Sequence, residues 1–151
     1  MKNILALMAS LIAIPAIADD VGFNHGSSIV FHMASNHSGQ EELNESNPGI
    51  SYRHGIDSVN LFATGGFFRN SFNRTSVYVG VGKTFFTIGP AAFTLVSGLA
   101  TGYIEKLTPA LIPEVSFHYK QASFVVGYIP GIRYQDTFTI PAFTFSVAAR
   151  F

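Results

Sequence analysis

The C-terminal run 138–151 alternates between two kinds of side chain, and this period of two constrains the fold more than any other feature of the chain. One face of such a run would carry the larger apolar residues, which are Phe143, Phe145, Val147, Ala149 and Phe151. The other face would carry small or polar residues, which are Thr144, Ser146, Ala148 and Arg150. The pattern is typical of a membrane β-barrel strand, in which one face contacts lipid and the other lines the lumen.

Alternation of this kind recurs along the chain and predicts an all-β fold, an eight-stranded antiparallel transmembrane β-barrel. The runs lie near residues 26–36, 48–55, 58–68, 75–86, 91–103, 110–119, 122–130 and 138–151. Connections near 37–47, 69–74, 104–109 and 131–137 are longer or more polar than those near 56–57, 87–90 and 120–121. Long loops at one end and tight turns at the other favour an outer-membrane barrel with periplasmic N- and C-termini. A soluble lipocalin-like barrel is the alternative.

The N-terminus and the composition point to export and to contact with lipid. Residues 1–18 are predicted to be a signal peptide, because the apolar run from Ile4 to Ile14 is followed by small residues ending at Ala18. That run is too short to span a bilayer, so residues 19–151 would form the outer-membrane β-barrel domain. Charged residues make up 12% and hydrophobic residues 48% of the chain, with fifteen Phe, which suggests apolar side chains that face lipid.

Charge and cysteine content exclude several classes of function. Nine basic residues balance nine acidic ones, so the chain lacks the basic surface that nucleic-acid binding needs. The absence of Cys excludes a disulfide framework, a thiolate zinc site and thiol catalysis. No metal site is expected, because His32 and His37 lie five residues apart in a predicted strand and would point to opposite faces.

The stretch 65–82, GGFFRNSFNRTSVYVGVG, combines a polar loop with glycines at alternate positions of the next strand. In that strand Tyr78, Gly80 and Gly82 would face the lumen, opposite the valines. Small inward residues would leave an apolar slot suited to a hydrocarbon chain. Strand curvature or bulging is the alternative explanation of these glycines.

Six short stretches, spread over most of the predicted mature chain, carry a resemblance to a known family. They are Ile29-Val30-Phe31-His32, Leu43-Asn44-Glu45, Phe68-Arg69-Asn70-Ser71-Phe72-Asn73-Arg74, Gly80-Val81-Gly82, Leu111-Ile112-Pro113 and Tyr128-Ile129-Pro130-Gly131. In this order they resemble motifs of the lipid A palmitoyltransferase family of outer-membrane β-barrels. The resemblance implies transfer of a palmitoyl chain from a phospholipid to lipid A without a soluble cofactor.

The resemblance also implies roles for individual residues. His32 matches the family's catalytic His and Ser71 its catalytic Ser, whereas Asn70 stands where the family has a catalytic Asp. Gly82 matches the glycine that floors the acyl pocket in the family. Pro113 and Pro130 match prolines that frame lateral gaps through which lipids pass.

The residues themselves could support this chemistry in more than one way. His32 can relay protons. Its place in the two-residue alternation of the first strand predicts a side chain that faces the lumen near the loop end. Ser71 could act as a nucleophile or as a hydroxyl that orients the acceptor, and ordinary turn chemistry is the structural alternative. Asn70 could donate a hydrogen bond to an oxyanion, although it cannot supply the negative charge of Asp. Arg69 and Arg74 could pair with lipid A phosphates or simply meet lipid headgroups.

These observations lead to one predicted function and one alternative. The predicted function is an outer-membrane acyltransferase that moves a palmitoyl-like chain from a phospholipid to lipid A or a related acceptor. The alternative is a non-enzymatic small barrel that acts as a surface shield, adhesin or exclusion factor. We expect a monomer in the outer membrane of a Gram-negative bacterium, encoded by the host or by a phage, with membrane lipids as partners. The terminal Phe151 resembles the signal read by the barrel-assembly machinery.

Overall fold

The structure, a computed structural model, places most of the chain after the predicted signal peptide. It describes residues 26–37, 42–56, 60–103, 107–131, 133–134, 137–138 and 140–151. The predicted signal peptide at 1–18 lies outside these residues. No helix among them is long and apolar enough to cross a membrane.

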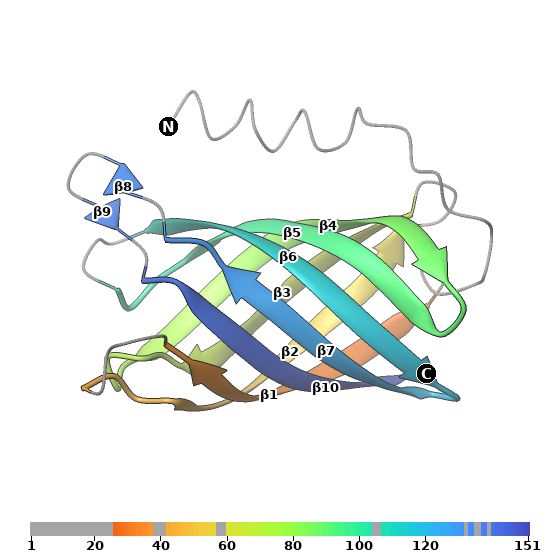
Figure 1. The fold of residues 1–151 in the computed structure, drawn as a ribbon, viewed down its shortest axis with the longest axis horizontal. Coiled ribbons are helices and arrows are strands. Elements are labelled where there is room, and N and C mark those ends of the chain that lie inside the picture. The colour runs from red at the N-terminus through yellow and green to blue at the C-terminus, as the bar shows by residue number, and fades with distance from the viewer. Residues whose placement is uncertain are drawn as a thin grey trace.

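The described part of the chain forms a closed barrel of eight antiparallel strands, which confirms the predicted strand number and antiparallel closure (Figure 1). The barrel strands are β1 (Ser27–Asn36), β2 (Ser46–Ile56), β3 (Leu61–Arg69), β4 (Thr75–Ile88), β5 (Ala91–Ala100), β6 (Thr108–Tyr119), β7 (Ala122–Ile129) and β10 (Ala142–Arg150). Around the barrel they follow the order β1-β10-β7-β6-β5-β4-β3-β2, so each strand pairs with its sequence neighbours and β10 closes onto β1. Closure gives each of the eight barrel strands a partner on both sides along at least part of its length.

The last barrel strand starts later than the sequence pattern predicts. The run from 138 was expected to belong to it, but β10 begins at Ala142, directly after Pro141. Proline has no N–H to donate to a ladder, which explains the interruption. Residues upstream instead form a separate two-stranded sheet of β8 (Arg133–Tyr134) and β9 (Thr137–Phe138). Figure 1 shows this sheet at the opposite end of the barrel from the C-terminus.

Side chains alternate between the outside and the lumen as the sequence predicts. Large apolar side chains are exposed on the outside, among them Phe31, Phe67, Val79, Phe117 and Phe143. Small hydroxyl side chains are buried inside, among them Ser51, Thr64, Thr94, Ser116 and Ser146. The hydroxyl-lined lumen and the apolar exterior invert the arrangement of a soluble barrel, which normally fills its inside with apolar side chains.

A β-bulge at Met33 breaks this alternation in β1. His32 pairs with Ser146 of β10, but the next pair joins Ala34 to Phe145, so Met33 is the extra residue. Bulges of this kind shift the facing of every residue that follows. His32 and His37 therefore both line the lumen, and the expectation that they point to opposite faces is wrong.

An ion pair crosses the lumen of the barrel. Arg53 on β2 donates from Nη2 to Oε1 of Glu114 on β6 at 3.0 Å, and its Nη1 lies 3.0 Å from Oε2. The guanidinium also lies over the ring of Phe62, 5.0 Å from its centre. Because β2 and β6 are not neighbours around the barrel, this pair divides the lumen. A cavity of about 160 Å³ lies on the long-loop side and one of about 70 Å³ on the other, with Arg53 and Val125 lining both.

Replacing Glu114 by Gln should lower the free energy of unfolding by about 3–5 kcal/mol, because it leaves the Arg53 charge uncompensated inside the barrel. Equilibrium urea unfolding of the protein in lipid vesicles measures this change. The control is the double variant Arg53→Met/Glu114→Met, which removes both charges and should stay close to wild type. Equal destabilisation of the single and the double variant would contradict the assigned role of the ion pair.

Candidate functional site

The larger cavity is the candidate site, and its deep wall is apolar. Side chains of β5, β6 and β7 form this wall, among them Val96, Leu99, Ala100, Ala110, Ile112 and Ile129. Apart from the Arg53–Glu114 ion pair, three buried polar atoms of lining residues have no hydrogen-bond partner within the described part of the chain: Asn47 Oδ1, Thr64 Oγ1 and Thr108 Oγ1. Buried polar atoms usually find a partner, so these mark where a ligand or water would bind.

Two facing glycines, Gly80 on β4 and Gly98 on β5, give the cavity part of its width. They pair directly, and a Cβ at either would lie 2.5 Å from a backbone oxygen of the opposite strand. Only glycine therefore fits this close approach. Gly82 has a different neighbour, because the ring of Phe62 occupies the space above it and a Cβ there would lie 2.1 Å from that ring. Gly82 therefore lines neither cavity, whereas Arg53 closes the inner end of the larger one.

The barrel wall lacks strand pairing beside this cavity. The β6–β7 ladder ends at the pair Glu114–Gly127, whereas β6 continues back to Thr108 along β5. Residues 108–113 of β6 thus have no ladder partner in β7 among the described residues. Pro113 lies within this unpaired part of β6, and Pro130 directly follows β7. Both predicted prolines thus flank one interruption of the wall.

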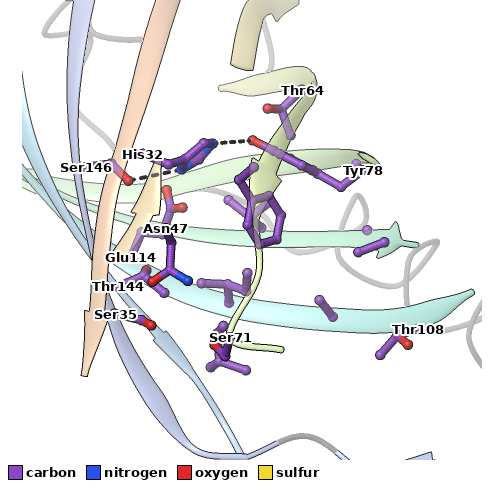
Figure 2. A pocket seen from close by; sticks show the side chains of 18 of the residues that line it. His32, Ser35, Asn47, Thr64, Ser71, Tyr78, Thr108, Glu114, Thr144 and Ser146 are labelled. Carbon is purple, nitrogen blue, oxygen red and sulfur yellow. Dashed lines mark hydrogen bonds between the residues drawn. The ribbon is translucent and has the colours of Figure 1, made fainter. Parts of the chain in front are cut away.

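His32 is held inside the barrel by three hydroxyl groups. Its Nδ1 lies 3.2 Å from Ser146 Oγ, and its Nε2 lies 3.1 Å from Ser51 Oγ and 3.2 Å from Tyr78 Oη. Figure 2 shows the ring between Ser146 and Tyr78. The rings of Phe68 and Tyr78 each lie 5.8 Å from it. His32, Tyr78 and Gly80, all predicted from the sequence, therefore line one cavity.

Ser71, at the mouth of the same cavity, contacts His37 rather than His32. Its Oγ lies 2.8 Å from His37 Nε2. The first long loop and the loop after β3 are joined here, because Asn44 N–H donates to the carbonyl of Ser71 at 2.9 Å. The N–H of His37 donates to Glu45 Oε1 at 3.3 Å. The sequence did not predict this role of His37, because regular two-residue alternation places His37 on the outside and only the bulge at Met33 turns it inward.

Asn70 is fully buried, and its side chain makes as many hydrogen bonds as it can. Its Nδ2 donates to Ser76 Oγ at 3.0 Å and to the carbonyl of Gly102 at 2.9 Å. Its Oδ1 accepts from the backbone N–H groups of Phe72 and Arg74, each at 3.0 Å. Both amide hydrogens thus have protein acceptors, so the geometry gives Asn70 the role of fixing the loop that carries Ser71.

Gly102 belongs to the same network and depends on being glycine. Its φ is +85°, a conformation that favours glycine, and an added Cβ would lie 2.6 Å from the carbonyl oxygen of Thr75. With glycine at this position, the carbonyl of Gly102 lies close enough to accept a hydrogen bond from Asn70 Nδ2. This contact joins the loop after β3 to the loop after β5.

Two titratable groups of the loop end are held neutral near pH 7. Burial lowers the pKa of His37, although the negative charge of Glu45 partly opposes the shift. A neutral imidazole can accept a proton. Burial also raises the pKa of Tyr103 to about 12, so its hydroxyl keeps its proton. Tyr103 lines the cavity and packs edge-on against Phe72, with ring centres 6.1 Å apart.

The two arginines predicted to bind lipid lie outside the cavity. Arg69 and Arg74 are exposed on the rim, at the end of β3 and just before β4. Arg69 Nε donates to Asn73 Oδ1 at 3.0 Å. Both can meet an anionic group from the surroundings but not one inside the barrel.

Replacing Asn70 by Asp should lower the free energy of unfolding by about 1–3 kcal/mol. A carboxylate has no hydrogen to donate and would face the carbonyl of Gly102. Thermal unfolding in detergent micelles, compared with wild type, measures the change. Asn73→Asp is the matched control, because Asn73 is exposed and uses its side-chain oxygen as an acceptor for Arg69. A loss of stability in the control as large as in Asn70→Asp would refute the proposed network.

The described residues thus place a neutral imidazole, a serine hydroxyl and an apolar cavity side by side at the long-loop end of the barrel. No protein-family model matches this chain, and a search of curated proteins finds no significant match.

Proposed function

We propose that this protein is an outer-membrane acyltransferase that moves a fatty acyl chain from a phospholipid to lipid A or a related lipid acceptor. The observation that carries the proposal is the apolar cavity that opens beside Ser71, His37 and His32. Acyl transfer needs a place for the chain, a hydroxyl or acceptor near the ester and a group that moves a proton. All three are present around this one cavity.

The outer surface supports a membrane location. The exposed Phe, Val and Ile side chains form the kind of apolar exterior that contacts hydrocarbon in outer-membrane barrels. The long loops lie at the end that would face the cell surface, and the C-terminus lies at the other. Lipid A occupies the outer leaflet, so its headgroup would lie at the level of the rim.

The interruption between β6 and β7 supports access from the membrane. Ala110 and Ile112 of β6, which have no partner in β7, line the cavity on one side of this interruption, and Ile129 lines it on the other. An acyl chain could pass between the strands without leaving an apolar environment. A chain that entered in this way would bring its ester to the mouth, where Ser71 lies.

The size of the cavity bears on the length of the chain. An apolar cavity of about 150 Å³ holds a molecule of the size of benzene, and the enclosed part here is about 160 Å³. The enclosed part therefore accommodates only several methylene groups. A palmitoyl-length chain would extend through the mouth or through the β6–β7 interruption.

The rim arginines support an anionic acceptor. Arg69 and Arg74 lie in the segment around Ser71, and guanidinium groups bind phosphate through paired hydrogen bonds. The phosphates of lipid A would be held at the rim by this contact. The acceptor hydroxyl of lipid A could then reach the mouth of the cavity.

Lipid A from cells that express the protein, in a strain without its own palmitoyltransferase, should gain the mass of one acyl chain. Mass spectrometry of extracted lipid A measures the gain, and its size reports the length of the chain. Ser71→Ala should abolish the gain. Ser46→Ala is the matched control, since Ser46 is an exposed serine at the same end of the barrel whose side chain does not line the cavity.

Unchanged lipid A, with the folded barrel recovered from the outer membrane, would refute the proposed acceptor. Such a result would favour the non-enzymatic alternative of a surface shield, adhesin or exclusion factor. Folding is checked by the heat-dependent shift in electrophoretic mobility that small barrels show.

A further inference from the structure

We infer that Ser71 is the nucleophile of this site and His37 its general base, so that the acyl chain passes through a covalent ester on Ser71. The inference rests on the proposed acyl transfer for the identity of its substrate. It names a different histidine from the one that the sequence resemblance implies. It also means that the acyl chain is transferred twice, first from the donor lipid to Ser71 and then from Ser71 to the acceptor lipid, rather than directly between the two lipids.

The distance between the two side chains carries the inference. Ser71 Oγ lies 2.8 Å from His37 Nε2, well within the reach needed for transfer of the hydroxyl proton. Both residues line the cavity. A chain lying along the apolar wall would therefore present its ester carbonyl close to this pair.

His37 has neighbours on β1 and on the first long loop. Its Nδ1 lies 3.5 Å from Ser35 Oγ, and its backbone N–H donates to Glu45 Oε1 at 3.3 Å. The carbonyl of Glu45 in turn accepts from Ser35 N–H at 2.9 Å. Nucleophile, base and a third orienting group form the arrangement that activates a serine in hydrolases and acyltransferases. Here Ser35 Oγ lies beside the ring nitrogen Nδ1, and Glu45 fixes the backbone of His37.

The loop that carries Ser71 is held just as firmly. The Asn70 side chain makes four hydrogen bonds to Phe72, Arg74, Ser76 and Gly102. The carbonyl of Ser71 accepts from Asn44 on the first loop. A nucleophile fixed on both sides pays little conformational entropy at the moment of attack.

His32 has other partners. Its Nδ1 contacts Ser146, and its Nε2 contacts Ser51 and Tyr78. These hydroxyls come from three strands around the lumen, so His32 is a positioning residue for the wall of the cavity. The hydrogen bond of Ser71 goes to His37.

The reaction follows in two balanced steps. Ser71 Oγ attacks the ester carbonyl carbon of the donor phospholipid while its proton moves to His37 Nε2. The bond to the glycerol oxygen then breaks, and that oxygen takes the proton from His37, which releases a lysophospholipid and leaves an acyl ester on Ser71. A hydroxyl of the acceptor next attacks this ester and gives its proton to His37, and Ser71 Oγ leaves and recovers the proton. No other reactant is consumed.

A long-chain alkyl fluorophosphonate tests the pair in the folded, full-length barrel in detergent micelles. An activated serine displaces fluoride from this reagent and keeps the phosphonyl group, which intact-mass spectrometry detects and peptide mapping locates. We expect one adduct on Ser71 and none in Ser71→Ala. In His37→Gln the labelling rate should fall by about 10²–10⁴-fold, the usual contribution of a general base.

The substitution His37→Gln separates the base from a merely structural contact. Glutamine retains an amide that can hydrogen-bond Ser71, but it cannot take up the proton. His54→Gln is the matched control, because His54 is exposed and lines neither cavity. Full labelling of His37→Gln, or labelling that depends on His32 instead, would overturn the inference.

The inference and the proposed function can fail separately. An adduct on Ser71 that needs His37, together with unmodified lipid A in cells, would keep the nucleophile pair and reject the proposed acceptor. Acyl gain on lipid A that persists in Ser71→Ala, with no fluorophosphonate adduct in wild type, would keep the transfer and reject the covalent route.

Discussion

The β-bulge at Met33 is the constraint on which the arrangement of the site depends. One unpaired residue moves Ser35 and His37 to the lumen side of β1, while His32 keeps its inward position before the bulge. Without it, two-residue alternation would place His37 on the outside. The serine of the neighbouring loop would then have no imidazole within reach. Bulges are frequent next to active sites, where they re-aim a side chain, and this bulge supplies the partner of Ser71.

The hydrogen bonds of Asn70 change how the resemblance to the palmitoyltransferase family applies. An Asp at this position could stabilise an imidazolium through its negative charge. Asn70 has no charge, and both of its amide hydrogens are donated to Ser76 and Gly102. It joins two loops and thereby fixes the position of the next residue in the chain. The chemical role that the family gives to this position would have to come from elsewhere in the mouth. The contact between His37 and Ser71 is the one that the geometry offers.

Much of the barrel could be predicted from the sequence because its signal is local. Two-residue alternation and turn residues specify the strands and their even number, and the closed eight-stranded barrel confirms this prediction. The start of the last strand and the facing of His37 were predicted wrongly. The site could be predicted only in part. His32, Tyr78, Gly80 and Ser71 do line one cavity, but a bulge has no composition signature and the partner of Ser71 was missed. The Arg53–Glu114 pair joins two strands that are not neighbours around the barrel, and Phe62 packs over Gly82 of the adjacent strand. Neither contact can be predicted from the pattern of one strand.

The ion pair across the lumen explains why the two cavities differ in chemistry. A buried pair stabilises little by itself, since the cost of removing both charges from water offsets most of their attraction. Its effect here is geometric, because Arg53 spans the lumen to Glu114 and covers Phe62. Below it the smaller cavity is lined by Thr84, Thr94 and other hydroxyl side chains, whereas above it the wall is apolar. An acyl chain entering from the loop end would therefore stop at the ion pair, because burying further methylene groups would require displacing a charged side chain. In this way a contact that adds little to stability would limit how deep the chain can reach.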